Sequence, residues 1–142
     1  MRYLLDSNIL RYFTGSQPNL DYHLARIPAS EIGIPFFVVI EQLRGRFDAY
    51  LKAAPENLLR EQTRLLETQA FLTNYQTVYA TEASVAALQA LRQKVSTHKR
   101  YVDVMIASLA LAENATVVTR NVEDFRDLLP ADKIQNWIDD RH

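Results

Sequence analysis

The clearest alternation of helix and strand lies in residues 102–119, which read VDVMIASLALAENATVVT. Residues 102–113 are apolar and contain several small side chains, which favours a closely packed helix. Asn114-Ala115 then turns the chain, and the β-branched run at 116–119 predicts a strand. A helix that leads directly into a strand is typical of α/β proteins.

The same alternation extends to both ends of the chain. Short apolar runs predict further strands at residues 2–5, 31–35, 77–79 and 133–135. Helical spacing or capping residues predict helices at 9–13, 20–27, 36–50, 56–74, 81–97 and 121–129. The start of the 36–50 segment is apolar enough to be a strand instead. We expect an α/β fold in which a short parallel sheet is flanked by helices.

The amino-acid composition excludes several classes of function. The chain has 142 residues and a net charge of −1, which fits one domain over residues 1–142 and excludes a globally basic nucleic-acid binder. It has no cysteine, so disulfides, thiolate metal sites and a cysteine nucleophile are excluded. The start of the chain shows no signal peptide, and no apolar stretch is long enough to span a membrane. We therefore expect a soluble, cytoplasmic protein.

Four acidic residues stand beside apolar runs at distant points of the chain: Asp6, Glu41, Asp103 and Asp124. Functional residues of parallel sheets gather outside the carboxyl ends of the strands, which favours a meeting of Asp6 with the 121–124 segment. Clustered carboxylates repel one another unless a proton or a cation neutralises part of the charge. Oxygen ligands of this kind suit Mg²⁺ or Mn²⁺. The pattern thus predicts a divalent-metal site.

Each acid also has a purely structural explanation. Those explanations are an N-cap at Asp6, a helix-dipole contact at Asp103, an ion pair of Glu41 with Arg44, and a capping box of Asn121 with Asp124. The specificity therefore lies in the joint order and spacing of the acids.

That joint pattern resembles the PIN-domain ribonucleases, and within them the small VapC-type toxins of bacterial and archaeal toxin–antitoxin pairs. The resemblance spans essentially the whole chain. It is carried by LDSNIL at 5–10, IEQLRG at 40–45, DVMIA at 103–107, ATVVTRNVEDF at 115–125 and IQNW at 134–137.

The resemblance implies a set of site residues. Asp6, Glu41 and Asp103 occupy the three firm acidic positions, as catalytic residues and metal ligands. The fourth position falls on Asp124 or on Asn121, because family members differ there. Secondary metal or RNA contacts are implied at Ser7, Asn8, Thr119 and Asn121.

The resemblance also implies an activity. It is that of a Mg²⁺- or Mn²⁺-dependent endoribonuclease toxin of a type II toxin–antitoxin module, which hydrolyses RNA with a metal-activated water. Glu41 would position or deprotonate that water, or bind a second ion. The implied partners are the RNA, a cognate antitoxin and a second copy in a homodimer. Apolar residues on the 36–50 and 56–74 helices are the expected docking surface for the antitoxin, and packing within the protein explains them equally well. The alternative is a catalytically inactive PIN-fold module that binds RNA or protein.

Basic residues near the acids suggest how RNA would be held. Arg44, Arg100 and Arg120 are the predicted phosphate-binding residues, with Arg46 and Lys99 nearby. Arg100 and Arg120 are favoured because they flank Asp103 and Asn121. Solvation or pairing with neighbouring acids explains the same arginines equally well. Tyr12 and Tyr101 have the chemistry to stack on a base, and His98 has that of an acid or base, but half-buried aromatics and a helix-end histidine need no such role.

Two other enzyme classes place an aspartate after an early strand. Haloacid-dehalogenase-like phosphatases carry a second aspartate two residues on, where this chain has Asn8. Receiver domains need a late lysine, but the strand at 116–119 is followed by Arg120-Asn121. Both classes therefore fit this chain less well. The chain also has no G-x-x-x-x-G-K motif, which argues against a glycine-rich nucleotide-binding loop.

Overall fold

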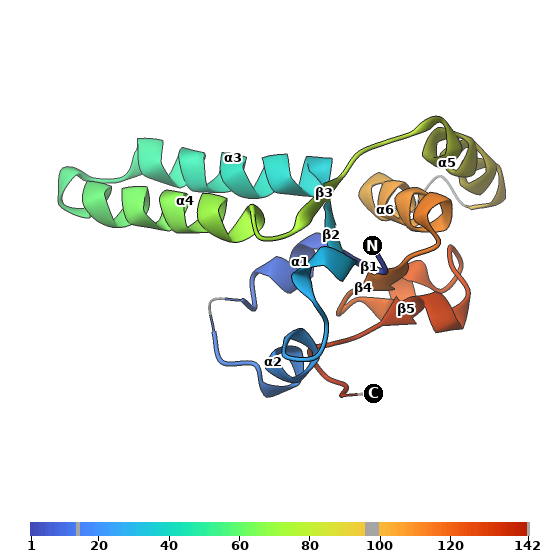
Figure 1. The fold of residues 1–142 in the computed structure, drawn as a ribbon. Coiled ribbons are helices and arrows are strands. Elements are labelled where there is room, and N and C mark those ends of the chain that lie inside the picture. Colours follow the sequence, from blue (N-terminus) through green and yellow to red (C-terminus); the bar gives the residue numbers. More distant parts are fainter. Residues whose placement is uncertain (14, 96–99, 142) are drawn as a thin grey trace.

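A computed structural model of the chain describes residues 1–13, 15–95 and 100–141. The described strands form one parallel sheet in the order β3-β2-β1-β4-β5 (Figure 1). They are β1 Tyr3–Leu5, β2 Ile32–Pro35, β3 Gln76–Val78, β4 Thr116–Val118 and β5 Ile134–Gln135. The predicted α/β class with a parallel sheet flanked by helices is confirmed.

The helices occupy the segments between the strands. They are α1 Ser7–Leu10, α2 Pro18–Leu24, α3 Phe36–Lys52, α4 Leu58–Leu72, α5 Glu82–Lys94 and α6 Tyr101–Glu113. Short 3-10 helices lie at Ala29–Glu31, Pro55–Asn57, Val122–Phe125 and Ala131–Lys133. α3 and α4 run side by side as a hairpin that reaches away from the sheet, and α5 packs on α6 (Figure 1).

Local sequence explains where these helices begin and end. Thr81 caps α5, because its hydroxyl accepts the N–H of Ser84 at 3.2 Å while the Ser84 hydroxyl accepts the N–H of Thr81 at 2.8 Å. Asn114 ends α6 in the left-handed conformation with φ 51°, which asparagine tolerates better than most residues. Residues 36–50, whose apolar start is also compatible with a strand, are entirely helical and lie within α3. The predicted end of α5 near residue 97 falls at Lys94, and residues 96–99 lie outside the described part of the chain.

The C-terminal segment is tied into the core. Trp137 is fully buried, with its ring 5.0 Å from Tyr3 and stacked on His23 at 4.9 Å between centroids. Its indole N–H donates to Gln135 Oε1 at 2.8 Å, which satisfies the one polar group of the side chain. The chain after β5 is therefore held against β1 and α2.

The hairpin of α3 and α4 leaves apolar side chains in solvent. On α4, Leu59 is 75% exposed and Leu66 is 54% exposed, and on α3 Ile40, Phe47 and Leu51 are exposed as well.

The buried acid of α4 is Glu61, which pairs with Arg64 at 3.2 Å and Arg60 at 3.5 Å. None of the helices in the described part of the chain combines the length and apolar character that a bilayer crossing requires.

The register of the two central strands sets up the site. β1 pairs with β4 so that Leu5 lies opposite Val118. The next residues, Asp6 and Thr119, are therefore neighbours at the carboxyl edge of the sheet, and the N–H of Asp6 donates to the carbonyl of Val118 at 2.9 Å. In open parallel sheets this edge is where ligands bind.

Candidate active site

Asp6 ends β1 and begins α1 with a buried carboxylate that is 4% exposed. Oδ1 accepts the backbone N–H of Ser7 at 2.7 Å, and Oδ2 accepts the hydroxyl of Thr119 at 2.8 Å. The structural explanation of Asp6 as an N-cap is thus realised in the structure. The second oxygen, however, is bound from a strand far away in the sequence.

Thr119 connects the secondary contacts that we expect around Asp6. Its side chain is fully buried, and its hydroxyl oxygen accepts the backbone N–H of Asn121 at 3.0 Å and the amide of Asn8 at 3.5 Å. The amide oxygen of Asn8 accepts the backbone N–H of Arg120 at 3.3 Å. Ser7, Asn8, Thr119 and the backbone of Asn121 are therefore gathered around the Asp6 carboxylate.

Asp103 approaches the same place from another element. It lies in the first turn of α6, where the helix dipole favours an acid, and it is 3% exposed. Its Oδ2 is 3.8 Å from Nε of Arg100. The charge of Arg100 also lowers the pKa of Asp6. The guanidinium of Arg100 thus pairs with Asp103 and also acts electrostatically on Asp6.

Burial dominates the electrostatics of Asp6. It raises the pKa of the carboxyl above its ordinary value, and this exceeds the opposing effects of the Thr119 and Ser7 hydrogen bonds and of Arg100. The ionised form is consequently penalised in the folded protein. A second positive charge beside Asp6 would relieve that penalty.

The other two predicted acids lie in less buried places. Glu41 is exposed in the second turn of α3. Asp124 is half-buried in the 3-10 helix Val122–Phe125, where its N–H donates to the carbonyl of Asn121 at 3.0 Å. Neither an ion pair of Glu41 with Arg44 nor a side-chain cap by Asn121 is present among the described residues, so those two structural explanations are wrong.

The acidic side chains of the site determine which metal ion it could hold. Over residues 1–13, 15–95 and 100–141, no three acidic or histidine side chains are placed to share one metal ion. Mg²⁺ needs fewer protein ligands, because it is commonly held by one or two carboxylates, several waters and substrate phosphates. The two buried carboxylates of Asp6 and Asp103, with the hydroxyl oxygens of Thr119 and Ser7 beside Asp6, match that requirement.

The predicted basic residues are distributed over two places. Arg100 and Arg120 lie exposed at the sheet edge, next to Asp103 and Thr119 respectively. Arg44 is exposed on α3, while Lys99 and His98 lie outside the described residues. Tyr12 accepts a hydrogen bond from Arg120 at 2.6 Å, and Tyr101 is exposed with Arg92 5.0 Å from its ring centre.

A groove of about 630 Å³ opens between the end of α1 and the α3–α4 hairpin. Its lining combines an apolar floor with a basic rim. The apolar residues are Leu10, Phe13, Phe71 and Leu72, the basic ones are Arg11, Arg46 and Arg64, and Glu67 is an acidic residue of the same lining. Arg46 therefore belongs to this groove in the structure, whose lining includes Gln42, the neighbour of Glu41.

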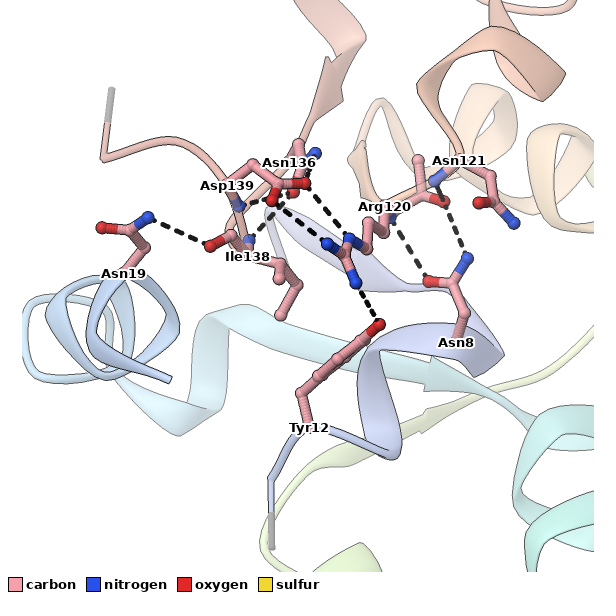
Figure 2. A network of polar contacts seen from close by, with 9 residues as sticks. Asn8, Tyr12, Asn19, Arg120, Asn121, Asn136, Ile138 and Asp139 are labelled. Carbon is pink, nitrogen blue, oxygen red and sulfur yellow. Dashed lines mark hydrogen bonds and ion pairs between the residues drawn. The ribbon is translucent and has the colours of Figure 1, made fainter. Parts of the chain in front are cut away.

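Asp139 and Asn136 are polar residues near Arg120 that were not predicted as site residues from the sequence. Asp139 pairs with Arg120 at 3.3 Å, and Asn136 donates to Asp139 at 2.8 Å (Figure 2). Asp139 and Arg120 are 19 residues apart and meet only through the fold. No local motif marks Asp139, so the sequence carries no signal that would have identified it.

Comparison with known families identifies the fold. The model of the PIN domain matches residues 3–128. The chain belongs to the PIN domain family, which confirms the family that its motifs resemble. No curated protein sequence matches the chain.

Several solved structures have the same fold, and three are described here. A toxin–antitoxin complex from Klebsiella pneumoniae matches with a TM-score of 0.69 and 18% identity over 95% of this chain and 97% of that one. FitAcB from Neisseria gonorrhoeae matches with a TM-score of 0.74 and 22% identity over 95% and 97%. VapBC2 from Rickettsia felis, bound to a DNA fragment from the promoter, matches with a TM-score of 0.65 and 26% identity over 96% and 99%.

Proposed function

We propose that this protein is a Mg²⁺- or Mn²⁺-dependent endoribonuclease and the toxin of a type II toxin–antitoxin module. The observation that carries the proposal is the pair of buried carboxylates, Asp6 and Asp103, with Arg100 paired to Asp103 and lowering the pKa of Asp6. Membership of the PIN domain family supports it, because PIN domains are generally nucleases. The similarity to chains of toxin–antitoxin complexes supports the role as a toxin.

Each residue of the site has a proposed role. Asp6 and Asp103 hold the divalent ion, and Ser7 and Thr119 fix the carboxylate of Asp6 through hydrogen bonds. When bound, such an ion polarises the scissile phosphate and a water molecule. Glu41 orients that water, and Asp124 or Asn121 supplies the fourth position of the site.

RNA binding is assigned to Arg44, Arg100 and Arg120. All three side chains are exposed, and the last two lie at the edge that carries Asp6 and Asp103. Arginine forks match the geometry of phosphate oxygens, so a few of them suffice to hold a backbone on a protein of net charge −1. Asn8 and the backbone of Asn121 are bonded to Thr119 beside Asp6, and we assign Asn8 and Asn121 to secondary metal or RNA contacts.

The cognate antitoxin is proposed to dock on the α3–α4 hairpin. Exposed apolar residues such as Leu59 and Leu66, and the groove, whose charged lining residues are three arginines and Glu67, favour a partner segment that carries apolar and acidic side chains. We also propose a cytoplasmic location, a single domain over residues 1–142, and a homodimer.

The proposal is tested by incubating purified protein with RNA in Mg²⁺, Mn²⁺ or EDTA. Wild-type protein should cut only with the divalent ions and leave 5′-phosphate and 3′-hydroxyl ends. Asp6→Asn and Asp103→Asn should lose that cleavage while retaining the fold, and Asp140→Asn is the charge-matched control. Full activity of either site variant, or activity of the wild type in EDTA, would overturn the assignment.

A catalytically inactive PIN-fold module that binds RNA or protein is the second candidate. One observation favours it, namely that no group of three acids able to share an ion occurs in the described part of the chain. Such a module would bind RNA or its partner without any cleavage in Mg²⁺ or Mn²⁺. The same incubation therefore distinguishes the two functions.

A further inference from the structure

Arg120 is held at three of its N–H groups. Nε and Nη2 donate to the two carboxylate oxygens of Asp139 at 3.3 and 3.4 Å, and Nη1 donates to the hydroxyl of Tyr12 at 2.6 Å (Figure 2). The Arg120 side chain is nevertheless 45% exposed. An exposed arginine ordinarily samples many rotamers, so these bonds select one orientation in advance.

The turn that carries Asp139 is itself ordered by Asn136. The Asn136 amide oxygen accepts the backbone N–H groups of Ile138 at 2.9 Å and Asp139 at 3.1 Å, while its amide nitrogen donates to Asp139 Oδ2 at 2.8 Å. The bond from Asn136 is the largest cause that lowers the pKa of Asp139. Both the backbone and the carboxylate of Asp139 are thereby fixed.

This turn is anchored to α2. The Asn19 amide donates to the carbonyl of Ile138 at 3.0 Å (Figure 2), and His23 Nε2 donates to the carbonyl of Asp140 at 2.9 Å. Trp137 is stacked on His23 in the core. Asp139 consequently sits on a segment held by the body of the protein.

The backbone of Arg120 lies beside Asp6 and Asn8, and its side chain extends from there toward Asp139 and Tyr12 (Figure 2). It follows Thr119, whose hydroxyl donates to Asp6, and its own backbone N–H donates to Asn8. A guanidinium carries five N–H donors, and the bonds to Asp139 and Tyr12 use three of them. With respect to the described residues, two donors remain for a further acceptor, and phosphate oxygens are acceptors that arginine prefers.

We propose that Asp139 and Tyr12 are positioning residues, which hold Arg120 as the cation that binds a backbone phosphate of the RNA at the edge of the site that follows β4. The inference rests on the proposed function, since RNA is the substrate named there. Asn136 supports this positioning of Arg120, because it orients the carboxylate of Asp139.

The test begins with binding in EDTA, where metal-dependent cleavage cannot occur. Fluorescence anisotropy of a labelled, mixed-sequence single-stranded RNA gives Kd at several salt concentrations. Arg120→Gln should weaken binding about tenfold and reduce the slope of log K against log salt by about 0.7, because one phosphate contact is lost. Asp139→Asn and Tyr12→Phe should each weaken binding about threefold, as expected for exposed contacts. Asp140→Asn, an equal charge change one residue away, should leave Kd unchanged.

A double variant shows whether Asp139 acts through Arg120. In the Arg120→Gln background, Asp139→Asn should add nothing to the loss of affinity, since its target is already gone. In Mg²⁺, Asp139→Asn should raise KM while kcat stays unchanged. Unchanged Kd in Asp139→Asn alongside a lower Tm would overturn the proposal, because the ion pair would then only hold the C-terminal turn. Tighter binding would overturn it too, because Asp139 would then compete with RNA.

The two proposals fail in different ways. If the wild type binds RNA but does not cut it in Mg²⁺, the nuclease function fails and the Kd series still decides the role of Arg120. If the wild type cuts RNA and Asp139→Asn binds normally, only the positioning role fails. A wild type that neither binds nor cuts RNA overturns both.

Discussion

Asp6 holds a carboxylate whose ionised form is disfavoured by its burial. Its pKa is raised in the folded protein, so the folded state binds that proton more tightly than the unfolded state. The folded protein is therefore more stable in acid, where the Asp6 carboxyl is protonated. This stability is lost as the pH rises through the raised pKa of Asp6. Near neutral pH and without a divalent ion, the ionised carboxylate therefore costs stability.

Asp6→Asn should accordingly raise Tm near neutral pH in EDTA. The asparagine removes the buried charge and remains a good N-cap for α1. The difference in Tm should shrink as the pH falls through the raised pKa of Asp6, because the wild-type carboxyl then becomes neutral. Thermal melts of both proteins over this range check the sign. A variant that is less stable than the wild type at every pH would contradict the electrostatic explanation.

Thr119 supports the site through one hydroxyl group. Thr119→Val keeps the shape but removes the donor to Asp6 and the acceptor for the N–H of Asn121. We expect the free energy of unfolding to fall by about 1–3 kcal/mol, because buried polar groups lose their partners. Thr119→Ser retains the hydroxyl and serves as the control in urea denaturation. Equal stability of the valine variant and the wild type would show that these bonds contribute nothing.

Sequence reasoning reached some of these residues and missed others for a physical reason. Asp6 and Asp103 stand in motifs that the chain displays locally, and strand order then brings Asp6 to Thr119. The pairing of Arg120 with Asp139 depends on where the C-terminal turn packs, and no local spacing encodes that. Glu41 is exposed in the second turn of α3, and which face of that helix is covered depends on its neighbours in the fold rather than on the local sequence.

At the scale of elements, the alternation of strands and helices was predictable because its signals are local. Capping at Thr81, the turn at Asn114 and the β-branched run of β4 all act within a few residues. The leucines of α4 recur at helical intervals, yet Leu59 and Leu66 face solvent while Glu61 is buried. Which side of a helix becomes covered depends on its neighbours, and α4 packs mainly on α3.

The close approach of β2 and β3 gives an element-level prediction. A Cβ at Gly33 would lie 2.5 Å from Cγ2 of Val78, a stiff β-branched side chain, so Gly33→Ala should lower the free energy of unfolding by about 1–3 kcal/mol. Gly45 lies inside α3, with nothing within 4 Å of such an added Cβ. Gly45→Ala should therefore stabilise the protein by about 0.5–1 kcal/mol. Urea denaturation of both variants checks the pair, and a destabilisation common to both would refute the local argument.

At the scale of the whole molecule, the parallel sheet and the helices that follow it bring segments from both ends of the chain to one edge. β1 contributes Asp6, α6 contributes Asp103, and the segment after β4 contributes Thr119 and Arg120. A hairpin with exposed apolar residues projects away from that edge (Figure 1).

A divalent ion that binds the folded protein at a preformed pocket must raise its melting temperature by mass action. The decisive measurement is Tm against Mn²⁺ and Mg²⁺ concentration for the wild type, Asp6→Asn, Asp103→Asn and the control Asp140→Asn. The wild type and the control should gain Tm progressively with either ion, while both site variants should stay flat. A wild type that does not respond, or site variants that respond as the wild type does, would show that Asp6 and Asp103 form no metal site.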